Sequence, residues 1–597
     1  MALSSIKDIF SCKTNQENTK KDLKTGLLVL FLYTAGIIIV SSFHELWFDE
    51  TQAWLIARCA SYKEILTYIP HYEGHPPLWH LLLSVFAKNG APVDFTLKAI
   101  NTVFSVTAMA LLIFRSPFPK IVRYLLPFTF YFFYQYGVLS RPYSLAMVAF
   151  MLLAITYKDR NAHPWRYILV LSLLCLVSAY GIMLAGGLCI VWTFEILSEL
   201  IRNKKMKFFW KDMRFYSLCF ILALAIVLII TILPADDCYY IGVENELSFI
   251  DKLKSLSDYE YFIILPFESW SGLLMGSKGL TDNIPLEIAE AFCGLLMWSG
   301  LIAITVKNKK LFTFILPYSM MTAFMAFKYS ALHHLGLGAL FHIFIFWIII
   351  EQNGEIVIPE FIKKINKNVA SPFIRKFAFA AAVFVCAVPL VYSCIASVSE
   401  IKELFGLSCL AETIKENHLE NAKIFAGWTV KYEHEDDEFE EDDYENSFSK
   451  YMFMVLEIPS EHPKVETNRT YLIGAAAMIE PYFDKNIFMN FNVEDPDILY
   501  MQYRYKEDVD AVFAKWREKG LPDFIIAYCP IDEVYSAEDM EGVRYLPIKH
   551  IKYASNIGKT GIEENYIYLY MRDDLFDDYP QFKWVNDQTG NVYERKT

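Results

Sequence analysis

Apolar and polar positions divide the chain into two parts with different patterns. Between residues 25 and 396 the apolar residues form long runs, such as TGLLVLFLYTAGIIIVSSF at 25–43, which carries no charge and is long enough to span a bilayer. After residue 398, AKIFAGW, DFIIAYC and ENYIYLYM alternate in the manner of β-strands, and KEDVDAVFAKWREKG has the spacing of an amphipathic helix. The pattern predicts a polytopic α-helical membrane protein with a C-terminal soluble α/β domain.

The lengths of the apolar runs predict about eleven transmembrane helices. We expect them near 25–47, 94–114, 122–138, 142–157, 167–180, 182–200, 215–234, 288–306, 311–327, 335–350 and 377–396. No signal-peptide cleavage pattern follows the first run, so we interpret it as a retained helix. PLWHLLLSVF is too short to span and is expected to lie as an apolar helix at the membrane interface, after a start that Pro76 and Pro77 favour.

Composition and charge support this division and predict an orientation. The chain is 54% hydrophobic with net charge −13, yet residues 1–398 have a balance of +7 and residues 399–597 a balance of −20. With the N-terminus inside, the inner segments collect 25 of the 34 Lys and Arg residues of the first part. We therefore expect a multi-pass protein of the cell membrane with a cytoplasmic tail at 1–24, a membrane domain at 25–397, a first outer loop at 48–93 and an extracytoplasmic domain at 398–597.

Several function classes lack their sequence signals. There is no Walker motif and no GxGxxG, which argues against a nucleotide-driven pump, and no basic stripe of the kind that binds nucleic acid. The eleven cysteines show no CxxC spacing. Within the soluble part, Glu433–Glu445 contains ten acids in thirteen residues, which indicates a solvated loop or, alternatively, a contact for calcium or a cationic polymer.

Unusual polar residues gather at the expected outer membrane level. They occur in ELWFDETQAW, HYEGHPPLWH, GVLSRPYSLAM and FKYSALHHLGLG, and they are Asp49, Glu50, His75, Arg141, Tyr143, Lys328, His333 and His334. Each has a simpler interpretation. The acid pair could mark the membrane boundary, Arg141 and Lys328 could extend toward lipid headgroups, and His75 could cap a turn. His71 and His75 could form a metal pair, although Gly74 and Pro76 argue against a helix there.

This set of side chains suits sugar transfer from a lipid-phosphate carrier. An acceptor hydroxyl must lose a proton to a base, for which a carboxylate is suited. The anomeric carbon gains positive character as its bond to phosphate breaks, and cations stabilise the leaving phosphate. Apolar helices can hold the lipid tail.

WFDETQAWLIA, GHPPLWHLLL and SRPYSLAM together resemble the GT-C membrane glycosyltransferases, in particular the protein O-mannosyltransferases, the aminoarabinose lipid A transferases and the RgtA-like enzymes. The resemblance covers roughly residues 25–200. It implies a GT-C fold and an inverting transfer from a polyprenyl-phosphate sugar on the extracytoplasmic face. Asp49 would be the base and Glu50 its partner, with His75 and Arg141 on the donor side. Leu332 stands where an arginine is expected, and no acid precedes Arg141.

Alternatives from other classes stay open. The chain could be a transporter or flippase for a lipid-linked sugar, or a membrane scaffold that binds glycan without catalysis, although we find no inverted repeat with broken spans. The expected partners are the polyprenyl-phosphate sugar donor, membrane lipid, and a glycan, lipid or protein acceptor. No cofactor is required by the sequence, while a divalent metal ion held by Asp49 and Glu50 remains open.

Overall fold

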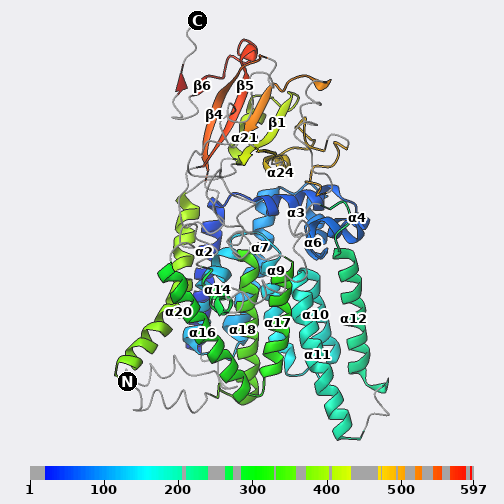
Figure 1. Cartoon of the computed structure of the whole chain (residues 1–597), viewed down its shortest axis with the longest axis vertical. Coiled ribbons are helices and arrows are strands. Elements are labelled where there is room, and N and C mark those ends of the chain that lie inside the picture. Colours follow the sequence, from blue (N-terminus) through cyan, green and yellow to red (C-terminus); the bar gives the residue numbers. More distant parts are fainter. Residues whose placement is uncertain are drawn as a thin grey trace.

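The computed structural model of the chain is mostly helical, with a small sheet in the C-terminal region (Figure 1). It describes residues 20–204, 210–238, 263–272, 284–328, 331–357, 372–402, 407–431, 468–471, 474–492, 495–503, 518–527, 531, 542–553, 565–585 and 592–593. The acidic segment 433–445 and most of the expected helix at 506–520 lie outside these residues.

The N-terminal part is built from helices of very different lengths. In chain order they are α2 (Lys20–Phe43), α3 (Phe48–Cys59), α4 (Tyr62–Thr67), α5 (Ile69–Glu73), α6 (Leu78–Ala87), α7 (Val93–Arg115), α8 (Lys120–Leu125), η1 (Leu126–Phe128), η2 (Tyr131–Gln135), α9 (Tyr143–Tyr157), α10 (Pro164–Val177), α11 (Ala179–Arg202), α12 (Met213–Ile232), α14 (Leu265–Ser271), α16 (Ile284–Lys307), α17 (Leu311–Phe327), α18 (Leu332–Asn353) and α20 (Pro372–Lys402). The helix expected after Pro77 is α6, and its place at the membrane interface stays a prediction.

Six helices are long and apolar enough to cross a membrane. They are Asp22–Phe43, Val93–Arg115, Ala179–Arg202, Met213–Ile232, Ile288–Lys307 and Leu332–Asn353. Shorter apolar helices occur at Leu78–Ala87, Tyr143–Tyr157, Pro164–Val177 and Leu311–Phe327. The expectation of several helices long and apolar enough to cross a membrane is thus confirmed among the described residues, while the count of about eleven stays a prediction.

The expected span at 122–138 is not one continuous helix. It divides into α8, the short 3₁₀ turn η1 and the π-helix η2. Pro127 lies inside this stretch and cannot donate a backbone hydrogen bond, which favours the break. The side chains of η2 are all buried, and such irregular backbone is tolerated at membrane depth where protein surrounds it. The second half of the run, residues 129–138, is therefore apolar because it is internal to the bundle.

Helix α18 is the centre of the bundle and α12 lies at its edge (Figure 1). Within its most apolar window 94% of α18 is buried, against 17% for α12. Helices α11 and α17 approach each other closely at Gly187, where a Cβ would lie 2.5 Å from the Cα of Pro317. Small residues allow this kind of backbone contact between apolar helices.

The C-terminal region, which is the expected soluble domain and keeps that name below, contains a five-stranded mixed sheet. Its strands are β1 (Ile424–Lys431), β2 (Asn468–Tyr471), β3 (Phe524–Ala527), β4 (Tyr545–Tyr553) and β5 (Asn565–Arg572), in the order β2-β1-β3-β5-β4. Only the β1–β3 pair among these is parallel. The three stretches with alternating patterns correspond to β1, β3 and β5, which confirms them as strands. The other elements are α21 (Leu407–Glu416), α24 (Gly474–Ile479), η6 (Glu480–Tyr482), η7 (Asp573–Leu575), β6 (Trp584–Val585) and β7 (Val592–Tyr593).

The soluble domain sits on the segment 48–93, which joins α2 to α7 (Figure 1). One buried cluster contains Leu55, Ile56 and Ile65 from this segment together with Leu410 and Ile424 of the soluble domain. Polar contacts reinforce the apolar ones, because the Arg58 guanidinium donates to the carbonyl oxygens of Glu480 and Pro481. The segment 48–93, which continues into the helical bundle, thus packs with the soluble domain in one buried cluster, the shared core.

Candidate functional site

Asp49 and Glu50 lie in the first turn of α3, in opposite surroundings. The Trp47 backbone N–H donates to Glu50 Oε2 at 2.8 Å and so secures the start of the helix. Neighbouring residues on a helix diverge by about 100°, so the two carboxylates cannot face the same way. The Asp49 side chain is 40% exposed, whereas that of Glu50 is wholly buried. Asp49 is therefore the member of the pair that a substrate can reach.

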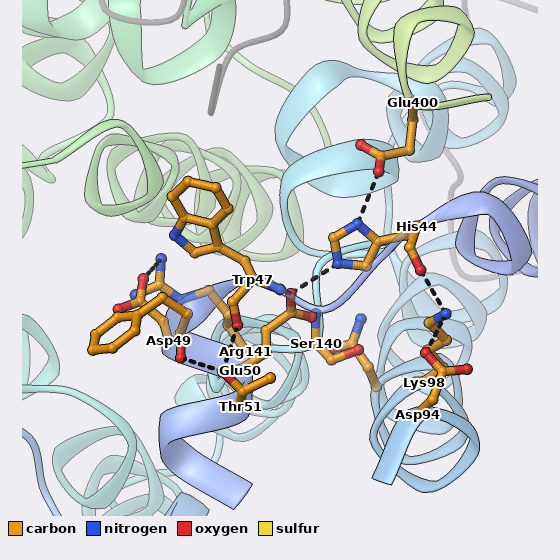
Figure 2. A network of polar contacts seen from close by, with 12 residues as sticks. His44, Trp47, Asp49, Glu50, Thr51, Asp94, Lys98, Ser140, Arg141 and Glu400 are labelled. Carbon is orange, nitrogen blue, oxygen red and sulfur yellow. Dashed lines mark hydrogen bonds and ion pairs between the residues drawn. The ribbon is translucent and has the colours of Figure 1, made fainter. Parts of the chain in front are cut away.

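Arg141 contacts Asp49 (Figure 2) and also a residue at the start of α18. Its Nη1 lies 3.1 Å from Asp49 Oδ2 and 3.0 Å from His333 Nδ1. A guanidinium can only donate, so His333 accepts at Nδ1 and carries its ring proton on Nε2. The guanidinium also lies 5.5 Å from the centre of the Tyr143 ring. Four of the predicted residues, from three distant segments, thus meet at one end of the bundle.

His75 contributes a neutral ring beside this ion pair. It follows Gly74, which ends α5 in the left-handed conformation with φ of 64°, and it precedes two prolines that fix the chain direction. Burial and the positive charge of Arg141 lower the pKa of His75 to about 4, against a smaller opposing effect of Asp49. Its Nδ1 atom is buried and has no hydrogen-bond partner within the described residues.

Glu73 is a second carboxylate near Asp49. Gln52 Nε2 donates to Glu73 Oε1 at 2.9 Å. Burial raises the pKa of Glu73 to about 7, the Gln52 hydrogen bond opposes this, and the negative charge of Asp49 adds to the rise. Glu73 can therefore hold or release a proton near neutral pH. The same Gln52 amide pairs with both backbone groups of Met501 at 2.8 Å, which ties this side of the site to the soluble domain.

The buried Glu50 carboxylate accepts hydrogen bonds from the backbone on both sides of the site. Its Oε1 accepts the backbone N–H of Ser140, the residue before Arg141, at 2.5 Å. Its Oε2 accepts from Trp47 and lies 2.8 Å from His44 Nε2. Burial would raise the pKa of Glu50, but the His44 charge and these N–H donors outweigh it and lower the pKa. Glu50 thus stays ionised as a fixed anchor of both Asp49 and Arg141.

His44 continues this network to α20 (Figure 2). Its Nδ1 lies 2.9 Å from Glu400 Oε1, and the Tyr134 hydroxyl donates to Glu400 Oε2 at 2.5 Å. Burial would lower the pKa of His44, but the carboxylates of Glu50 and Glu400 raise it to about 9. Lys98 also donates to the His44 carbonyl oxygen at 2.6 Å. The imidazolium lies between two buried carboxylates.

The remaining predicted site residues have different placements. Tyr143 stacks on Tyr136 with ring centres 5.2 Å apart and supports His333, whose ring centre is 5.3 Å away. His334 Nδ1 accepts the Ala331 backbone N–H at 3.0 Å, so this ring caps the start of α18. Lys328 directly follows α17 and is exposed, and no ion pair or hydrogen bond joins its ammonium to another described residue.

The two metal hypotheses stay predictions. His71 Nδ1 contacts the Leu233 carbonyl oxygen at 2.6 Å, away from His75, because α5 ends between the two histidines. Across the part of the chain that the structure describes, no three His, Cys, Asp or Glu side chains form a group suited to a metal ion. Glu50 already accepts three N–H donors, which leaves Asp49 as the accessible carboxylate of the pair.

Three functional candidates were missed by sequence reasoning. Glu73 lies in the HYEGHPP stretch, and its position two residues before His75 was the available signal. His44 stands at the end of the first apolar run, where a histidine has many ordinary explanations. Glu400 is 356 residues from His44, and no local pattern links the two.

A carboxylate that is accessible, an arginine beside it and neutral histidines form a site suited to proton transfer next to an anionic leaving group. Comparisons of the chain with family models, with curated proteins and with solved structures found no match. The functional assignment therefore rests on the residues and their geometry.

Proposed function

We propose that this protein is an integral membrane glycosyltransferase that transfers a sugar from a polyprenyl-phosphate donor to an acceptor hydroxyl on the extracytoplasmic face. The observation that carries the proposal is the contact of exposed Asp49 with Arg141 at 3.1 Å, at the end of an apolar helical bundle. A base and a phosphate-binding cation are the two groups that this reaction needs side by side.

In the proposed mechanism the Asp49 carboxylate accepts the proton of the acceptor hydroxyl. The acceptor oxygen then bonds to the anomeric carbon from the face opposite the phosphate, and the bond from that carbon to the phosphate oxygen breaks. The configuration inverts, because attack and departure occur on opposite faces. The electron pair of the broken bond stays with the polyprenyl phosphate, and the proton on Asp49 later passes to solvent.

Arg141 has two roles in this scheme. Before the donor binds, it neutralises Asp49, and it also donates to His333. The donor phosphate competes with Asp49 for the guanidinium, so donor binding frees the carboxylate to act as a base. His75 and His333 are neutral rings that offer hydrogen bonds to sugar hydroxyls without competing for the phosphate.

The finer architecture belongs to the same proposal. It has a GT-C fold of about eleven spans, a cytoplasmic N-terminus and an extracytoplasmic soluble domain. Six helices that can cross a membrane and the excess of Lys and Arg in the expected inner segments support it. The GT-C family resemblance of residues 25–200 supports the reaction class.

The test is a gene deletion complemented with wild-type protein or the Asp49→Asn variant, with surface glycans and lipid-linked sugars quantified together. Asp49→Asn should slow transfer by about a hundredfold or more, the lower size of a general-base effect. The matched control is Glu195→Gln. Glu195 is 39% exposed and pairs with Arg160 at 2.6 Å, and Arg160 lies beyond the opposite end of α9 from Arg141. A well-inserted Asp49→Asn protein with normal transfer would refute the proposal.

The same experiment separates the rival functions. A missing glycosyl unit with accumulated donor identifies a transferase, whereas donor that accumulates on the inner leaflet alone indicates a flippase. A glycan-binding scaffold would tolerate the loss of Asp49. Treatment of the purified protein with EDTA, followed by readdition of divalent ions, tests whether a metal ion takes part.

A further inference from the structure

The buried His44 ring connects segments that are far apart in the chain. His44 follows directly on α2, Glu50 belongs to α3, Glu400 to the last turn of α20, and Tyr134 to η2. The side chains of His44, Glu50 and Glu400 are at most 4% exposed. The ring-to-carboxylate distances of 2.8 and 2.9 Å show that both ring nitrogens are engaged.

The donors around the two carboxylates favour the ionised form of both. Glu50 accepts the N–H groups of Trp47 and Ser140, and Glu400 accepts the Tyr134 hydroxyl. A neutral imidazole has one N–H and would place a lone pair against one of the carboxylates. A protonated ring donates to both, so hydrogen bonding favours a bridge with charges of −1, +1 and −1.

The bridge lies between the soluble domain and the reacting groups. Glu400 is two residues before the end of α20, and the next described element, α21, is part of the shared core on the segment 48–93. At the other end of the bridge, Glu50 holds the backbone beside Asp49 and the backbone beside Arg141. A shift of α20 is thus transmitted to the distance between the base and the cation.

We propose that Glu400 and Tyr134 are positioning residues of the transfer reaction, which fix the Asp49–Arg141 geometry through His44 and Glu50. The inference rests on the proposed function for its rate measurements. It adds to that function the requirement that the end of α20 be packed with Glu400 against His44 for fast transfer.

A pair of conservative variants tests the bridge. Tyr134→Phe removes only the hydroxyl that donates to Glu400. The control Tyr33→Phe also removes a buried hydroxyl, which donates at 2.8 Å to the carbonyl oxygen of Phe132, a residue of the same π-helix as Tyr134. We expect a severalfold lower kcat for Tyr134→Phe, with the KM for donor little changed, and normal kcat for Tyr33→Phe. Glu400→Gln should lower kcat more, up to about a hundredfold for a displaced catalytic group.

The double variant Tyr134→Phe/Glu400→Gln separates positioning from general packing. If the hydroxyl acts through Glu400, the double variant has the kcat of Glu400→Gln alone. The inference would be overturned if the two losses of kcat multiply in the double variant, or if Tyr134→Phe and Tyr33→Phe have equal kcat. If the wild-type protein transfers no sugar, the proposed function fails. Unfolding temperatures of the same variants then test the bridge itself, and additive shifts for the single and double variants would refute it.

Discussion

Replacement of Arg141 by lysine tests whether the guanidinium recognises the donor phosphate. Arg141 contacts Asp49 and His333 through the same nitrogen and lies over the Tyr143 ring. Lysine keeps the positive charge but has one nitrogen and no planar fork, so it cannot reproduce bidentate phosphate binding.

The structure sets the size of the expected effect. Loss of one hydrogen bond to a charged group costs about 1.5–3 kcal/mol. Since about 1.4 kcal/mol corresponds to a factor of ten, kcat/KM for the donor should fall by roughly 10- to 150-fold. The assay is release of polyprenyl phosphate from a synthetic donor by protein in liposomes, with the concentration of donor varied.

The matched control is Arg160→Lys. The Arg160 side chain has the same 12% exposure as that of Arg141, pairs with Glu195 and lies 3.9 Å from the centre of the Tyr157 ring, but it is at the other end of α9. Donor kcat/KM within twofold of wild type for Arg141→Lys would refute the reasoning, as would an equal loss for Arg160→Lys. Either result would favour an arginine whose contacts with Asp49 and His333 are only structural.

Three further outcomes are expected. Gly187→Ala places a Cβ against the Pro317 backbone and should lower the free energy of unfolding by about 1–3 kcal/mol. Gly186→Ala is the control, because its Cβ would meet only the end of the Met320 side chain at 3.5 Å and should be tolerated. Thermal unfolding measures both variants. Because the pKa of His44 is raised from 6.5 to about 9, its stabilisation is complete below about pH 6.5 and is lost as the pH rises to 9. The unfolding temperature of wild type should therefore fall across that window, and that of His44→Gln should fall less, because Glu73, with its pKa raised to about 7, still titrates there. Gln52→Ala leaves the Met501 N–H and carbonyl oxygen without their hydrogen bonds, which should lower the free energy of unfolding by about 1–3 kcal/mol. Faster proteolysis of the soluble domain would show this loss.

The sequence predicts elements well where a single physical pattern determines them. Long apolar runs correspond to α2, α7 and α18, and the stretches AKIFAGW and ENYIYLYM correspond to β1 and β5, because burial in lipid or in a sheet core requires apolar side chains. The run at 122–138 misleads for the same reason, since burial inside the protein has the same apolar signature as burial in lipid.

The site could be predicted only in part. A shared membrane level for Asp49 and Arg141 followed from charge and span order, and their contact is consistent with it. The sequence could not predict which of Asp49 and Glu50 is exposed and which is buried. Adjacent side chains on a helix point in different directions, and Glu50 is the buried one because it contacts Ser140 and His44. The link to Glu400 depends on tertiary packing alone.

The shared core beneath the soluble domain has a consequence for biosynthesis. Gln52 and Met501 are 449 residues apart in the chain, so a ribosome that adds about 5–20 residues per second makes the second roughly 20–90 s after the first. During that interval the segment that carries Asp49 lacks the surface against which it packs. A nascent chain therefore lacks this packing around the segment that carries Asp49 until Met501 has been added, and shorter products leave the apolar face of that segment uncovered.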